Sequence, residues 1–134
     1  MYDKIIIGAG IYGLYAALYC GARGEHVAVL EKDDSSFSRA TYVNQARVHL
    51  GYHYPRSLST ALSTASYFDR FVSDWPSCIK QDFDQIYATS SRFSWTQADA
   101  FEKFAEAAGI GCRRAAVENY FRDGMVDGAF LTDE

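Results

Sequence analysis

The sequence contains few prolines and cysteines, and basic residues are not in excess. Three cysteines occur among its 134 residues, at Cys20, Cys78 and Cys112. They form no C-x-x-C pair, which argues against a zinc site and against a dithiol redox motif. Their odd number and long spacings also exclude a secreted disulfide framework. We therefore expect no metal site, and we expect a cytoplasmic protein with free thiols.

The charge balance and the hydrophobic runs exclude further classes of protein. Thirteen Lys plus Arg against seventeen Asp plus Glu give a net charge of −4, which argues against nucleic acid or anionic membranes as partners. The apolar stretch from Ile5 to Cys20 is interrupted by glycines, lacks a positive flank and is shorter than the ~20 residues of a membrane span. Because 49% of the residues are hydrophobic, we expect a folded chain. The shortness of the apolar stretch predicts that it does not span a membrane.

The first thirty residues predict a β-α-β unit. The β-branched run Lys4–Ile7 is typical of a strand that is buried in a parallel sheet. Residues 11–23 are rich in Leu, Ala and Tyr and predict a helix, with Gly24 at the position of a left-handed cap. Val27–Leu30 is a second candidate strand. A strand, a helix and a strand within about thirty residues are typical of two parallel strands joined by a crossover helix.

The rest of the chain predicts two more helices and several short strands. Residues 57–72 form an amphipathic pattern, and a second helix is expected between Thr96, its predicted N-cap, and Gly109. The apolar face of the first comprises Leu58, Ala61, Leu62, Ala65, Phe68 and Val72. That of the second comprises Ala98, Phe101, Phe104, Ala105 and Ala108. Strands are expected over residues 83–89, 112–114 and 126–132.

Residues 8–13, GAGIYG, match the G-x-G-x-x-G pattern between the first strand and its helix. Gly8 permits the tight turn, Gly10 lets a pyrophosphate approach the backbone, and Gly13 lets the helix pack closely on the strands. The helix N-terminus offers free N–H groups to the phosphates. Glu31, at the end of the next strand, stands where a carboxylate accepts hydrogen bonds from ribose hydroxyls. Together these features predict a dinucleotide site.

The acidic residue narrows the choice of dinucleotide. A 2′-phosphate would meet the carboxylate of Glu31, so NADP fits the pattern least well. The residues alone leave FAD and NAD as alternatives.

Two segments resemble one family of flavoenzymes. Residues 2–32 resemble the opening of the FAD-dependent oxidoreductases of the D-amino acid oxidase and glycine oxidase superfamily. Residues 44–57, NQARVHLGYHYPRS, resemble the N-S-G-V-I-H-x-G-x-Y-Y segment of the branch that contains L-2-hydroxyglutarate oxidases. Gln45, Ala46 and Arg47 depart from that segment, where the pattern has serine, glycine and an aliphatic residue.

The resemblance implies a cofactor and a set of residues that bind it. FAD is the implied cofactor, and the segment after the second strand is implied to run beneath the flavin. The implied cofactor-binding residues are Gly8, Gly10, Ile11, Tyr12, Gly13, Glu31, Lys32, Arg39, Ala40, Thr41, Asn44 and Gln45.

Histidine suits proton transfer near neutral pH, and the resemblance points to one histidine in particular. His49 matches the family histidine and is the candidate general base, with a structural role near the flavin as the alternative. Arg47, Tyr52, His53 and Tyr54 are candidates for binding a small-molecule substrate. A bidentate pair with a carboxylate would suit Arg47. The tyrosines are equally compatible with an ordinary core position.

These observations predict an α/β fold. We expect residues 1–75 to be the N-terminal part of a Rossmann-like FAD-binding domain, and residues 76–134 to be part of an α+β substrate or cap domain. Because no second glycine cluster follows residue 60, the parallel sheet is expected to be incomplete. The predicted function is that of an FAD-dependent oxidoreductase acting on an amino acid, a 2-hydroxy acid or a related small metabolite. The alternatives are a non-catalytic nucleotide-binding fragment or interaction module, and an NAD-linked enzyme.

Overall fold

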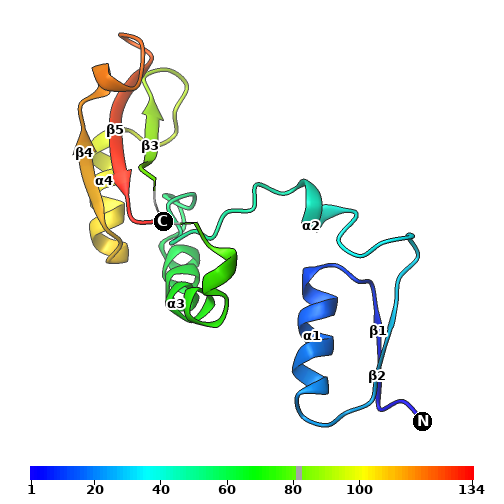
Figure 1. The fold of residues 1–134 in the computed structure, drawn as a ribbon. Helices are drawn as coiled ribbons and strands as arrows, with labels where there is room; N and C mark the ends of the chain where they lie inside the picture. The colour runs from blue at the N-terminus through cyan, green and yellow to red at the C-terminus, as the bar shows by residue number, and fades with distance from the viewer. Residues whose placement is uncertain (81–82) are drawn as a thin grey trace. The chain divides into compact units, whose positions relative to one another are not determined.

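The computed structural model describes residues 1–80 and 83–134. The chain divides into two compact units, Met1–Arg47 and Val48–Glu134, and each is described by itself. The α-helices and strands of both units are labelled in Figure 1. The predicted boundary after residue 75 separates an FAD-binding part from a substrate or cap domain. It is a boundary between functions and not between compact units, and it stays a prediction.

The first unit is the predicted β-α-β unit. Strand β1 (Lys4–Ile7) pairs in parallel with β2 (Val27–Leu30), and helix α1 (Ile11–Gly21) packs on both strands. The helix ends two residues before the predicted Arg23. Gly24 has a φ of +84°, which confirms the left-handed position expected after the helix. A short helix, α2 (Ala40–Val43), follows in the long connection after β2.

The sheet of the first unit has two strands, and much of its apolar surface is exposed. Ile5, Ile7 and Leu30 are 64%, 88% and 56% exposed. Parallel strands normally have both faces covered, which explains why their sequences are apolar on both sides. The α/β class and the incomplete sheet are therefore confirmed as a partial Rossmann-like arrangement.

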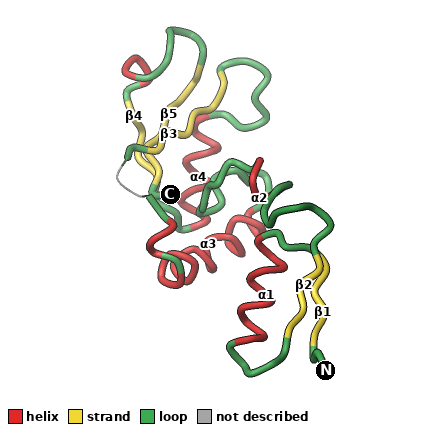
Figure 2. Tube along the Cα trace, turned by 45° about the vertical axis from the view of Figure 1, so that its right-hand side comes forward, coloured by secondary structure: helices red, strands yellow, loops and turns green. Residues whose placement is uncertain are grey.

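The second unit is an antiparallel sheet covered by a helix. The elements of this unit are α3 (Leu58–Asp74), η1 (Pro76–Cys78), β3 (Gln85–Ser90), α4 (Ala98–Ala108), β4 (Cys112–Ala115), η2 (Val117–Asn119) and β5 (Val126–Thr132). The strands lie in the order β3-β5-β4, and both pairings are antiparallel. Helix α4 packs against all three strands, as Figures 1 and 2 show.

The core of the second unit lies between α4 and the sheet. All five residues of the predicted apolar face of α4 are buried. Phe101 and Phe130 are fully buried, with ring centroids 4.9 Å apart. Gly109 ends the helix in the left-handed conformation with a φ of +66°, as predicted. The periodicity of the sequence therefore located this core correctly.

One prediction for this unit, the N-cap of α4, was wrong. Helix α4 begins at Ala98 after Gln97, so Thr96 is not its N-cap. The Ala98 N–H instead donates to the Asp127 carboxylate of β5. In α3, of the six predicted apolar residues, only Ala61 is buried, and Leu58 and Leu62 are exposed. Helix α3 has the predicted amphipathic pattern, but its neighbours within the unit cover only a small part of the apolar face.

Candidate functional site

The glycine motif forms the turn between β1 and α1, with the geometry that its sequence predicts. The strand ends at Ile7 and the helix begins at Ile11. Gly8 has a φ of +100°, and its N–H donates to the Leu30 carbonyl at 2.7 Å. A Cβ atom on Gly13 would lie 1.9 Å from the Gly8 carbonyl oxygen. Helix and strand can therefore approach this closely only because residue 13 has no side chain.

Glu31 lies beside this turn, directly after β2. Its Oε2 accepts the Ala9 N–H at 2.6 Å, and its Oε1 accepts the N–H groups of Lys32 and Asp33 at 2.8 and 3.0 Å. These backbone hydrogen bonds, of which that from Ala9 has the largest effect, lower the pKa of the Glu31 carboxyl. The carboxylate is therefore charged at neutral pH and held at the glycine turn. The predicted proximity of Glu31 to the turn is confirmed.

The segment after β2 returns to the same turn. The Ile11 N–H, at the start of α1, donates to the Thr41 hydroxyl at 3.1 Å. The Phe37 N–H donates to the Ala9 carbonyl at 3.0 Å. A Cβ atom on Gly10 would lie 3.3 Å from the Thr41 hydroxyl, so the space between them is narrow. Helix N–H groups, a glycine without a side chain and a nearby hydroxyl together suit a phosphate group.

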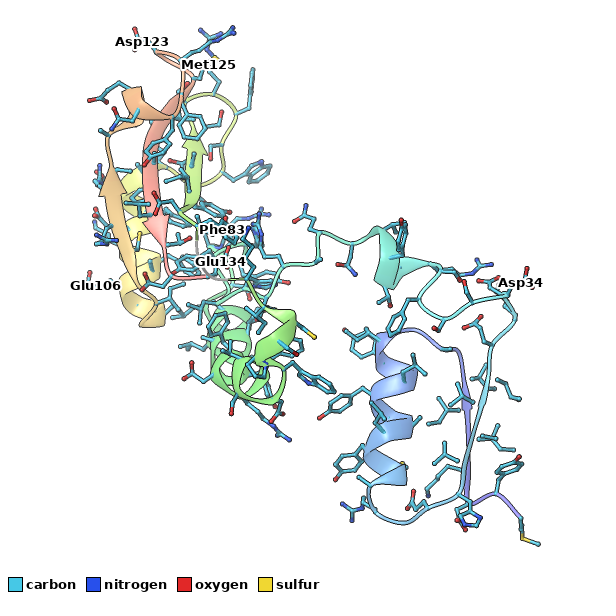
Figure 3. The ribbon with its side chains drawn as sticks, viewed as in Figure 1. Asp34, Phe83, Glu106, Asp123, Met125 and Glu134 are labelled. Atoms are coloured by element: carbon cyan, nitrogen blue, oxygen red, sulfur yellow. The ribbon has the colours of Figure 1, made fainter. Side chains whose placement is uncertain are left out.

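Arg39 is held by an acidic neighbour. Its Nε and one terminal nitrogen donate to the two carboxylate oxygens of Asp33, at 2.5 and 2.8 Å. This bidentate pair lowers the pKa of the Asp33 carboxyl to about 2. Arg39 was predicted to bind the cofactor, and in this structure its guanidinium fixes the loop from Asp33 to Arg39. In Figure 3, Asp34 projects outward from the same loop.

The other predicted cofactor residues differ in their surroundings. Asn44 donates to the Thr41 carbonyl at 2.6 Å and to that of Ala40 at 3.2 Å, and so fixes the end of α2. Tyr12 is 89% exposed. Lys32, Ala40 and Gln45 are exposed as well. Their contact with a cofactor stays a prediction.

Three predicted residues of the second unit come together with a fourth, in a group that we call the histidine cluster. The ring of His49 lies 5.3 Å from that of His53 and 5.7 Å from that of Tyr54. The ring of His53 lies 5.7 Å from that of Tyr87 on β3. The histidine cluster therefore comprises His49, His53, Tyr54 and Tyr87.

Tyr87 was missed by sequence reasoning. It lies in a strand that the sequence predicts, but nothing in its own neighbourhood indicates that it meets a histidine 34 positions earlier.

The loop that carries the histidine cluster is packed on α3. Gly51 has a φ of +103°, and a Cβ atom there would lie 2.8 Å from the Ala61 Cα. The Tyr54 N–H donates to the Gly51 carbonyl at 2.9 Å, which closes a turn around His53. The glycine at position 51 therefore fixes the positions of the cluster's histidines.

Tyr52 differs from its neighbours because it is completely buried. Its hydroxyl donates to the Gly111 carbonyl and accepts the Asp133 N–H at 3.3 Å. Burial raises the pKa of the Tyr52 hydroxyl to about 12. The packing therefore favours the core alternative for Tyr52 over a place in an open pocket.

The predicted position of His49 opposite a flavin involves both units. Residues 8–47, with Arg47 at their end, belong to the first unit, and the histidine cluster belongs to the second. That position of His49 therefore stays a prediction.

Comparison with known proteins places the chain among flavoproteins. The family described as FAD dependent oxidoreductase (DAO) matches residues 3–132. The FAD-dependent monooxygenase FPY4 of Fusarium mangiferae is 29% identical over 128 residues, which are 96% of this chain and 32% of that protein. The D-amino acid dehydrogenase of Vibrio atlanticus is 35% identical over 53 residues, 40% of this chain and 13% of that protein.

A third relative gives a similar picture. The FAD-dependent monooxygenase kojA of Aspergillus flavus is 30% identical over 83 residues, which are 62% of this chain and 19% of that protein. The chain thus spans about a third or less of the length of these relatives. Within the described residues, no helix is long and apolar enough to cross a membrane.

Proposed function

Because the chain belongs to the FAD-dependent oxidoreductase family, we propose that it supplies the nucleotide-binding turn of a flavoenzyme that oxidises an amino acid, a 2-hydroxy acid or a related small metabolite. The observation that carries the proposal is the hydrogen bond from the Ala9 N–H to Glu31. It joins the glycine turn to the acidic residue, and an adenine dinucleotide needs both at one place. FAD is the cofactor that the family indicates.

The residues of the turn have distinct roles in this proposal. The N–H groups at the start of α1 and the Thr41 hydroxyl hold the pyrophosphate, which approaches over Gly10. Three of the roughly four lone-pair sites of Glu31 keep its bonds to the backbone, and the remaining one accepts a ribose hydroxyl. When bound, FAD would supply the acceptor for the hydride of the substrate.

The histidine cluster is the proposed catalytic region. His49 accepts the proton of the substrate amine or hydroxyl, and its contacts with His53 and Tyr54 fix the plane of its ring. Arg47, His53 and Tyr54 are proposed to bind the substrate. Each of these roles follows from the resemblance of residues 44–57 to the flavin-adjacent segment of the family, and the ring contacts support a common site for the histidines.

A second candidate activity is oxygen insertion by a flavin monooxygenase. One observation favours it: the match to the monooxygenase FPY4 covers 96% of this chain, whereas the match to the D-amino acid dehydrogenase covers 40%. A monooxygenase needs molecular oxygen and an external source of electrons. The substrate of an oxidase or dehydrogenase instead supplies the electrons itself.

Titration calorimetry with FAD tests the cofactor site. Gly10→Val is expected to abolish binding, because its side chain would fill the space beside Thr41. Glu31→Ala is expected to weaken binding by about tenfold or more, the effect of a lost hydrogen bond to a charged group. Unchanged affinity in both variants would reject the site, and absence of FAD binding by an unaltered protein that contains this segment and the missing part of the fold would favour a non-catalytic module.

Anaerobic mixing tests the type of reaction once FAD is bound. Bleaching of the flavin absorbance by an amino acid or a 2-hydroxy acid would identify an oxidase or dehydrogenase. A flavin that only NADH or NADPH bleaches, with oxygen then consumed in the presence of a substrate, would identify a monooxygenase.

A further inference from the structure

A cavity lies at the β3 edge of the antiparallel sheet, within the second unit. Its volume is about 290 Å³, close to the lower end of the range for small-molecule sites. We call it the β3 groove. Its main lining residues are Pro55, Arg56, Tyr87, Thr89, Trp95 and Phe101. None of the roles proposed above uses Arg56 or Trp95.

The aromatic walls of the β3 groove are partly preformed. The ring of Tyr87 stacks on that of Phe101, with centroids 4.6 Å apart and an interplanar angle of 7°. Phe101 is fully buried in the core, so it fixes the Tyr87 ring from behind. Trp95, in contrast, is 86% exposed. Its exposed indole ring offers a flat apolar surface on which an aromatic ligand can stack.

Arg56 is the cationic group of the β3 groove. Its guanidinium lies 5.3 Å from the centre of the Trp95 ring. It forms no ion pair with an acidic residue of the described ranges, unlike Arg39, Arg70 and Arg114. A guanidinium that stacks on a ring keeps the N–H groups along its edge, and their fork geometry matches a carboxylate.

Three of the hydroxyl groups that line the β3 groove have partners within the protein. Ser90 donates to the Arg92 carbonyl, and Ser94 donates to the Thr96 carbonyl at 2.6 Å. Thr89 donates to the Asp127 carboxylate at 2.5 Å. Arg56 is the charged residue of the lining, and its N–H groups are the donors best suited to an anion. The combination of one cation, exposed aromatic surface and a small volume defines the chemistry of a matching ligand.

We propose that the β3 groove binds a small aromatic carboxylate. The carboxylate accepts hydrogen bonds from the edge of the Arg56 guanidinium, and the aromatic ring packs on the exposed ring of Trp95 and the half-buried ring of Tyr87. Binding at this place requires no flavin. The β3 groove shares Tyr87 with the histidine cluster, but Arg56 has no role in the proposed function, so the Arg56 variants separate the two sites.

An NMR titration of the full chain with phenyllactate tests this inference. Amide and indole resonances of residues 87–96 are expected to shift on addition of phenyllactate. The neutral amide of the same compound is the matched probe, and it should bind at least tenfold more weakly. Arg56→Gln should weaken phenyllactate binding about tenfold or more, while Arg56→Lys should retain part of it. Arg113→Gln is the control and should leave binding unchanged, because Arg113 is an exposed residue on β4, the opposite edge strand of the sheet.

Three results would overturn the inference. The first is the absence of shifts in residues 87–96 at millimolar phenyllactate. The second is equal affinity for the acid and its amide, because the charge would then contribute nothing. The third is an equal loss in Arg56→Gln and Arg113→Gln, which would indicate unspecific attraction of the anion. The same spectra report whether each variant is folded. FAD binding is measured separately, so failure of one proposal leaves the other intact.

Discussion

Asp127 on β5 caps helix α4 from a distance of 29 residues in the sequence, through the bond from the Ala98 N–H to its Oδ2 at 2.8 Å. The other oxygen of the same carboxylate accepts the hydroxyl of Thr89, which is buried on β3. One side chain thus connects the start of the helix to two strands. A helix N-terminus has unpaired N–H groups, and an acidic residue there both accepts a bond and interacts favourably with the helix dipole.

We expect Asp127→Ala to destabilise the second unit by about 1–2 kcal/mol, because it removes the cap and leaves the Thr89 hydroxyl without its acceptor. Urea unfolding followed by circular dichroism measures the change. Asp123→Ala is the matched control, since Asp123 lies in the exposed turn before β5 (Figure 3). Equal unfolding midpoints in the two variants would show that the cap contributes nothing.

Two glycines of helix α1 are expected to respond in opposite ways to alanine. In Gly13→Ala the new Cβ would lie 1.9 Å from the Gly8 carbonyl oxygen, so helix and strand must separate and FAD binding is lost. In Gly21→Ala nothing lies within 4 Å of the new atom, and helix propensity favours alanine by up to ~1 kcal/mol. Thermal unfolding and FAD titration compare the variants. An FAD affinity of Gly13→Ala equal to that of Gly21→Ala would contradict the close packing at position 13.

The Asp33–Arg39 pair predicts a loss of stability in acid. The pKa of the Asp33 carboxyl in the folded protein, about 2, lies below its ordinary value of 3.8. The contribution of the pair is therefore complete above about pH 4 and disappears as the pH falls toward 2. We expect the Asp33 carboxyl carbon to titrate in NMR near pH 2, and Arg39→Gln to move that midpoint upward. A midpoint that does not change in Arg39→Gln would mean that another group lowers the pKa.

His49→Asn is expected to slow reduction of bound flavin by substrate about 10²–10⁴-fold, the usual effect of losing a general base, while flavin stays bound. Anaerobic stopped flow on a flavin-loaded enzyme that contains this segment measures the rate. His26→Asn is the control, because His26 is exposed before β2. Near-normal reduction in His49→Asn would assign the residue a structural role.

The parts of the fold that were predicted correctly depend on local patterns. The β-branched run Lys4–Ile7, the glycines after it and the apolar spacing of α4 each determine structure within a few residues. Glu31 was placed correctly because the β-α-β unit fixes where the second strand ends. In each case the signal and the structure it determines lie within one short segment or within one β-α-β unit.

The parts that were missed depend on contacts between distant segments. Thr96 was chosen as a cap because its residue type suits that position, but Asp127 caps the helix from another strand. Likewise, Tyr87 meets His53 only because the sheet and the preceding loop pack on each other. Arg39 and Asp33 are close in the sequence, unlike the pairs above. Their pairing was nevertheless missed, because an arginine in this loop could equally contact a phosphate.

The three hydrogen bonds between residues 31–41 and the glycine turn restrict the length of the connection that follows β2. Glu31 and Phe37 both bond to Ala9, and Thr41 bonds to Ile11. Deleting or inserting one residue between Glu31 and Phe37 would displace the later two contacts together. A protein engineer who wishes to exchange this connection with that of a relative should therefore transfer residues 31–41 as a single cassette, with its length preserved.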